Sequence, residues 1–261
     1  MQGLNTRFQI YYEQRIKHVQ NHLYEFGIND TETSMHEFRL ELKKLLSILK
    51  FLRKIYPKSN FKKQINILEK IFLIAGEIRE FQLLVKWLEN NELTDFRFNY
   101  FPNSVLQKNM YDLSIQIDHI KYDFGVLMQD AQSFVLGTNK ILIDQYLIDL
   151  NARIEKKISK NCTEQEWHEI RKLIKRKIYA ANWKEDIQDS NFAHFQKLQE
   201  LIGQWHDAEV MINTLTLKKS LFIKDIEMQK SYSFAIDKLN QSLLSRNKKV
   251  VEWLGKSGIF I

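Results

Sequence analysis

The stretch MHEFRLELKKLLSILKFL, residues 35–52, separates apolar residues from cations at helical spacing. Each residue of a helix advances by about 100°, so residues three, four and seven apart share one face. An apolar face of this kind normally packs into a protein core. The stretch therefore predicts an amphipathic helix. Its expected core-facing residues are Phe38, Leu42, Leu45, Ile48, Leu49 and Leu52.

The opposite side of the predicted helix carries a row of cations about 80° wide. A solvated helix face usually mixes signs, because Glu and Lys four residues apart stabilise a helix slightly. Side chains of like charge in one row repel each other and destabilise the helix slightly. The row is therefore more typical of a site for an anionic partner than of an ordinary solvent-exposed face. The row consists of His36, Arg39, Lys43, Ser47, Lys50 and Lys54, with Lys44 beside it.

The same pattern returns as WHEIRKLIKRK at residues 167–177, where His168 follows His36 by 132 positions (168 − 36). A second pair of segments follows in the same order, with Gly203 placed 127 positions after Gly76 (203 − 76). Two markers at nearly the same offset favour a duplicated half of about 130 residues. The second copy repeats the cations as His168, Arg171 and Lys175, flanked by Lys172 and Arg176, and His206 stands where the first half has Arg79.

The amino-acid composition is typical of a helical protein that binds a polyanion. The 261 residues include only 8 Gly and 2 Pro, too few for a loop-rich or all-β chain. Lys and Arg number 39 against 32 Asp and Glu, giving a net charge of +7, which suits a polyanionic partner. The single cysteine, Cys162, excludes an intramolecular disulfide and a multi-cysteine zinc cluster. We see no secretory signal or membrane-spanning run, so a soluble, cytoplasmic protein is expected.

Start and stop signals divide the chain into helices. Thr163 and Glu166 fit a capping box at the start of the second copy. Gly76 is expected to end one helix and precede another, and residues 90–104 read as the main loop. The expected helices are 7–26 (stopped by Gly27), about 35–56 (capped by Asp30, Thr33 or Ser34), 60–75, 77–90, 105–136, 140–160, 167–187, 195–215 and a last one ending near Leu244.

The ordered set of these markers resembles the two halves of a CHAD domain, the conserved histidine α-helical domain. The resemblance covers about residues 7–253. It implies an all-α fold, with two pseudo-symmetric antiparallel helical bundles from an internal duplication packed as one unit around a basic central cavity. It also implies a single domain over 1–261, with halves at about 1–135 and 138–261. The implied function is binding of inorganic polyphosphate in that cavity, without catalysis and without a cofactor or metal.

Carried over position by position, the family motif falls on cations of both halves. The family's further basic residue is replaced by Leu46 and Ile178, and Glu80 stands where Asp is usual, so affinity and preferred polymer length stay open. Lys50 and Lys54 come from helical geometry rather than from the family pattern. The predicted polyphosphate-binding residues are His36, Arg39, Lys43, Lys44, Lys50, Lys54, Arg79, His168, Arg171, Lys172, Lys175, Arg176 and His206.

Two other functions are compatible with a basic helical chain. A nucleic-acid-binding helical protein would explain the charge, but no helix-turn-helix or zinc-finger motif appears, and few aromatic residues accompany the basic rows. A metal-dependent phosphohydrolase would need several His and Asp residues converging on a metal, and His206 with Asp207 is only one pair. We expect no membrane partner. In crystals we expect sulfate or phosphate to occupy the site, and in the cell we expect an association with polyphosphate granules; the oligomeric state is left open.

Overall fold

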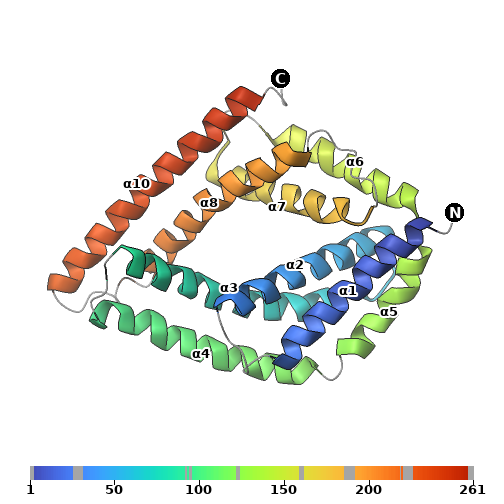
Figure 1. The fold of residues 1–261 in the computed structure, drawn as a ribbon, viewed down its shortest axis with the longest axis horizontal. Helices are drawn as coiled ribbons and strands as arrows, with labels where there is room; N and C mark the ends of the chain where they lie inside the picture. Colours follow the sequence, from blue (N-terminus) through green and yellow to red (C-terminus); the bar gives the residue numbers. More distant parts are fainter. Residues whose placement is uncertain are drawn as a thin grey trace. The chain divides into compact units, whose positions relative to one another are not determined.

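The structure is a computed structural model that describes residues 3–25, 32–91, 93, 96–121, 124–158, 162–184, 192–217, 219 and 226–257. The elements described in these ranges are helices, and no strand occurs among them, which confirms the all-α prediction. The helices are α1 (Gly3–Glu25), α2 (Glu32–Ile55), α3 (Phe61–Asn90), α4 (Phe96–Ile120), α5 (Phe124–Gly137), α6 (Lys140–Lys157), α7 (Glu164–Ala181), α8 (Phe192–Leu217) and α10 (Ile226–Ser257) (Figure 1).

The chain forms two compact units, and each is built from several separate segments. Unit 1 comprises Met1–Glu77, Asn109–Arg153 and Lys175–Asp189, and unit 2 comprises Ile78–Lys108, Ile154–Ile174 and Ser190–Ile261. The boundaries fall inside α3, α4, α6 and α7, so these helices contribute residues to both units. The predicted duplication, the division into halves and the shared basic cavity stay predictions.

Unit 1 has a core in which α2 packs with α1 and α5. All six residues predicted to face the core from α2 are at most 2% exposed, so the apolar face is confirmed. Beside them, Phe51 lies 4.9 Å from both Tyr146 and Trp183, measured between ring centroids, and Phe8 lies 5.3 Å from Trp183. Ring pairs of this kind add about 1 kcal/mol each beyond the area that they bury.

The cation row of α2 is not continuous in the structure. Ser47, its middle member, is only 6% exposed, and Leu46 and Phe51 around it are 5% and 0% exposed. The second half of α2 is therefore buried on nearly all sides, which one-sided periodicity does not reveal. The row is divided into an N-terminal group around Arg39 and a C-terminal pair, Lys50 and Lys54.

In unit 2, α8 and α10 run side by side and pack against each other (Figure 1). Apolar residues of α3, α8 and α10 form a shared cluster, and its members from α8 recur at helical spacing. This cluster holds the C-terminal part of α3 within unit 2. Its buried residues are Leu84, Leu88, Met211, Leu215, Tyr232, Ala235 and Leu239.

The expected helix break at Gly76 is wrong, because α3 continues through it from Phe61 to Asn90. Glycine inside a helix costs about 1 kcal/mol relative to alanine, so one glycine does not end a well-packed helix. Gly76 is buried against the guanidinium of Arg39, which explains a residue without a side chain at this place.

Other helix ends also differ from the predictions. Helix α4 begins at Phe96, inside the predicted loop, and α10 continues to Ser257 rather than ending near Leu244. The predicted helix 105–136 is divided into α4 and α5. Thr33 and Ser34 lie inside α2 instead of capping it, whereas Gly27 and Asp30 lie outside the described residues.

The capping box before α7 is confirmed. The Thr163 backbone N–H donates to the Glu166 carboxylate at 2.7 Å, and the Glu166 N–H donates to the Thr163 hydroxyl at 3.3 Å. Lys177, on the apolar side of the same helix, is only 4% exposed. Its ammonium donates to the side chain of Asn151 at 2.5 Å, because a buried ammonium needs an acceptor.

Candidate anion-binding site

In the first copy of the motif, Arg39 lies across α3. Its guanidinium is 5.0 Å from the centroid of the Phe72 ring, and its Nη2 atom is 3.4 Å from the place where a Cβ on Gly76 would stand. Phe72 and Gly76 are four residues apart and therefore share a face of α3. The guanidinium of Arg39 therefore packs against the face of α3 that carries Phe72 and Gly76.

In the second copy, Arg171 lies against the other marker glycine. Its Nη2 and Nε atoms are both 3.8 Å from the Cβ position of Gly203 in α8. The side chain of Gln199, four residues before Gly203, is 3.5 Å from the same position. Gln199 therefore takes the place that Phe72 takes in the first copy.

These two arrangements join the markers that the sequence paired. In each copy the arginine three residues after the histidine packs on the glycine of the following segment. A larger side chain at either glycine would occupy the space that the guanidinium needs. Helix packing thus positions the guanidinium of each arginine, a planar group whose donors suit the oxygens of a phosphate.

The two lysines after Arg39 differ in their surroundings. Lys43 lies 5.3 Å above the same Phe72 ring and is partly exposed. Lys44 instead donates to the carboxylate of Glu41 at 2.7 Å, and the other oxygen of Glu41 accepts from Arg15 of α1 at 2.7 Å. Glu41 is only 7% exposed, so this is a largely buried ion cluster.

Three further predicted cations also face carboxylates, in more exposed pairs. Lys50 pairs with Glu69 at 2.7 Å, Lys54 with Asp149 at 2.6 Å and Lys172 with Glu169 at 3.1 Å. Side chains in these pairs are about two-fifths or one-half exposed (39–51%), so each pair is weak and an arriving anion can compete for its lysine.

The second copy places two histidines together in unit 2. The rings of His168 in α7 and His206 in α8 are 4.8 Å apart between centroids, and His206 Nδ1 is 3.0 Å from the Glu209 carboxylate. Burial lowers the pKa of His168 below its ordinary value, and the positive charges of Lys172 and Arg171 lower it further. The neutral form of His168 is therefore favoured more than that of an ordinary histidine at the same pH.

Glu209 completes this group. Burial raises the pKa of Glu209, whereas the charges of His168 and Arg171 oppose the rise. One carboxylate therefore lies among three basic side chains in this part of unit 2. It can hold His206 in one orientation by hydrogen bonding.

The remaining predicted residues lie at partly or fully exposed positions. His36 is exposed on α2, and Arg79 is partly exposed on the part of α3 that belongs to unit 2. Lys175 and Arg176 are partly exposed on the part of α7 that belongs to unit 1. Burial raises the pKa of Tyr146, and the charge of Arg176 opposes that rise, which locates Arg176 near this ring.

Sequence reasoning missed four residues that shape the site. Arg15 lies 26 positions before Glu41, and nothing in the motif signals their pairing. Phe72 was read only as part of a helix. Glu41 was placed off the cation row, although it pairs with Lys44 three residues later, a spacing that predicts such a contact. Glu209 stands at the same spacing from His206.

The described residues include neither a metal site nor a membrane-spanning helix. Within the described ranges, no group of three or more His, Cys, Asp or Glu side chains is arranged to hold a metal ion. No helix in the part of the chain that the structure describes has the length and hydropathy to cross a bilayer.

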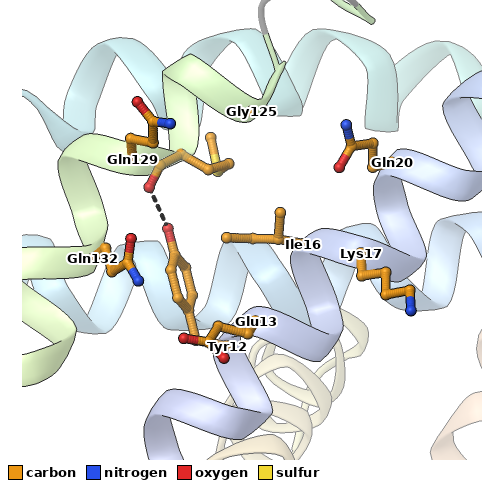
Figure 2. A pocket seen from close by; sticks show the side chains of 9 residues that line it. Tyr12, Glu13, Ile16, Lys17, Gln20, Gly125, Gln129 and Gln132 are labelled. Atoms are coloured by element: carbon orange, nitrogen blue, oxygen red, sulfur yellow. Dashed lines mark hydrogen bonds between the residues drawn. The ribbon is translucent and has the colours of Figure 1, made fainter.

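A hollow of about 280 Å³ lies elsewhere in unit 1, between α1 and α5 (Figure 2). None of the predicted anion-binding residues lines it. The Tyr12 hydroxyl donates to the Met128 carbonyl at 2.8 Å beside it. Its lining side chains come from Tyr12, Glu13, Ile16, Lys17, Gln20, Met128, Gln129 and Gln132, with Gly125 at its edge. A single cation among amides and one carboxylate does not make a polyanion site.

The geometry described so far defines an all-helical protein with two arginine–glycine contacts and clustered basic residues. Its fold is that of a CHAD domain. The crystal structure of the CHAD domain from the plant Ricinus communis superimposes with a TM-score of 0.74, covering 97% of this chain and 92% of that one at 15% sequence identity. No protein-family model matches the sequence, and no curated protein matches it.

Proposed function

We propose that this protein binds inorganic polyphosphate and that binding involves no catalysis. The observation that carries the proposal is the repeated seating of Arg39 on Gly76 and of Arg171 on Gly203 within a CHAD fold. Packing against the glycine positions each guanidinium before a ligand arrives, so less side-chain entropy is lost when it binds a phosphate. A polymer of linked phosphates can use such sites several at a time.

The other predicted residues contribute to different extents. His36, Lys43, Arg79, Lys175, Arg176, His168 and His206 supply further donors or charges at partly or fully exposed positions. Lys44, Lys50, Lys54 and Lys172 pair with carboxylates, and these pairs must open before the lysines can bind a phosphate. Binding is expected to be electrostatic and to weaken steeply with salt.

Direct titration with polyphosphate of defined length tests the proposal. We expect saturable binding, and weaker binding of single-stranded DNA of equal charge at the same salt concentration. The double variant R39E/R171E should keep its helical circular dichroism and lose binding. If that variant keeps the wild-type affinity, the site assignment is wrong. Equal or tighter binding of DNA would instead favour a nucleic-acid-binding protein.

An assay of released phosphate tests the non-catalytic part separately. Wild-type protein incubated with polyphosphate and a divalent metal should release no more phosphate than R39E/R171E, which serves as the matched control. Release by the wild type alone would identify a phosphohydrolase.

A further inference from the structure

The ion cluster around Glu41 distinguishes the two copies of the motif. The Glu41 carboxylate is 2.7 Å from Lys44 Nζ, 2.7 Å from Arg15 Nη1 and 3.6 Å from His18 Nδ1. Its side chain is 9% exposed, and the side chains of Arg15 and Lys44 are 11% and 21% exposed. The pairs are therefore shielded from water and hold more firmly than the surface pairs elsewhere.

The second copy has no such group at this place. Leu173 occupies the position of Glu41 (41 + 132 = 173), and it is 3% exposed among apolar residues of the core. Arg176 occupies the position of Lys44 (44 + 132 = 176). The same motif thus carries a buried carboxylate in one copy and a leucine in the other.

We propose, on the basis of the proposed polyphosphate function, that Glu41 is an internal counter-charge that keeps Lys44 on the protein. The first copy then binds a polyanion with one cation fewer than its sequence suggests. Arg15 of α1 takes no part in binding, because it is only 9% exposed and donates to Glu41. Its role is to hold the carboxylate in place.

A double substitution that leaves the net charge unchanged gives the sharpest test. The variant R15M/E41L removes one positive and one negative charge, so the net charge stays the same while Lys44 is released. A buried ion pair replaced by apolar residues of similar size commonly keeps the fold. We expect polyphosphate affinity to rise about threefold or more at a given salt concentration. The slope of log affinity against log salt should steepen by about 0.7, the contribution of one further phosphate contact.

Three companion variants trace the gain to Lys44. R15M/E41L/K44M should return to the wild-type affinity and slope. K44M alone should change the wild-type affinity by less than about twofold, whereas R176M should lower it by about threefold or more, since one contact of this kind is lost. A purely structural role of Glu41 would not move the salt slope in this pattern.

If the double variant does not fold, two single substitutions, E41Q and E37Q, test the proposal instead. E41Q keeps an acceptor for Arg15 and removes the negative charge, and E37Q makes the same change at an exposed position of α2. E41Q should raise affinity clearly more than E37Q does. Equal effects would mean that Glu41 acts only through net charge, and a loss of affinity in E41Q would mean that it orients Lys44 for binding; either result overturns the proposal.

The titrations also separate this proposal from the one on which it rests. They are run on folded protein with sodium polyphosphate between about 50 and 200 mM salt. If the wild type binds and R15M/E41L binds no more tightly, only the counter-charge is wrong. If no folded protein in the set binds polyphosphate, the proposed function and the counter-charge both fail.

Discussion

The two copies of the histidine–arginine motif, residues 35–46 in α2 and 167–178 in α7, share their spacing but differ in the neighbours that the fold brings to them. In α2 the arginine lies over an aromatic ring, and a nearby lysine is held by a buried carboxylate. In α7 the arginine lies beside Gln199, and the histidine meets a second histidine. A motif therefore fixes which cations are present, whereas the surrounding helices decide how much of each charge a ligand meets.

The largest effect that tests this comparison is on stability. E41A leaves the buried guanidinium of Arg15 without its carboxylate, and the free energy of unfolding should fall by about 3 kcal/mol or more. The exposed control E37A should change it by less than about 0.5 kcal/mol. Urea unfolding followed by circular dichroism measures both. A loss below about 1 kcal/mol in E41A would show that the cluster is not a closed ion pair.

The second effect concerns the glycines that the two copies share. A leucine at position 76 or 203 needs the space of the guanidinium, so G76L and G203L should each weaken polyphosphate binding about tenfold, as the loss of one charge-assisted hydrogen bond would. G125L is the matched control, since a Cβ at this helical glycine meets nothing within 4 Å. Titration with polyphosphate, after a check of helical content, measures the effect. Unchanged affinity in G76L would mean that Arg39 is not part of the binding site. Unchanged affinity in G203L would mean the same for Arg171.

Much of this arrangement could be predicted from the sequence, and the rest could not for identifiable reasons. Periodicity identified the apolar face of α2, because hydrophobic burial acts on whole helix faces. It could not show that Ser47 and Lys177 are buried too, since that depends on which elements cover the other faces. Gly76 was misread as a helix end, because a local rule does not include the arginine of another helix that needs its space.

The third effect is a pH dependence that belongs to the second copy. In free protein the pKa of His168 is lowered by burial, Lys172 and Arg171, and a bound polyanion would raise it. Between the two pKa values binding takes up a proton, so affinity falls as pH rises through that window. We expect an affinity a few-fold higher near pH 6 than near pH 8. Calorimetry in two buffers of different ionisation enthalpy measures the proton uptake.

The control for this effect is H168Q, which keeps a hydrogen-bond donor and cannot charge. The charged or titratable groups around His168 are Glu169, Arg171 and Lys172 on its own helix and His206 and Glu209 on α8. H168Q should therefore lose most of the proton uptake, and H206Q reports what His206 adds. Proton uptake of wild-type size in H168Q would assign the pH dependence to other groups.

The smallest effect concerns the C-terminal pair of the first row, Lys50 and Lys54, which Ser47 separates from Arg39. K54M should change polyphosphate affinity by less than about twofold, because Lys54 already pairs with Asp149 on an open surface. The hydrogen bond from Lys54 is the main cause that lowers the pKa of Asp149. The pair thus stabilises the fold above the unfolded-state pKa of Asp149, and this contribution is lost as pH falls through the lowered folded-state value. Thermal unfolding of D149N and wild type should differ slightly at neutral pH and converge in acid. A loss of affinity of about tenfold in K54M would extend the first copy's binding surface past Ser47, and the two copies would then differ in length as well as in charge.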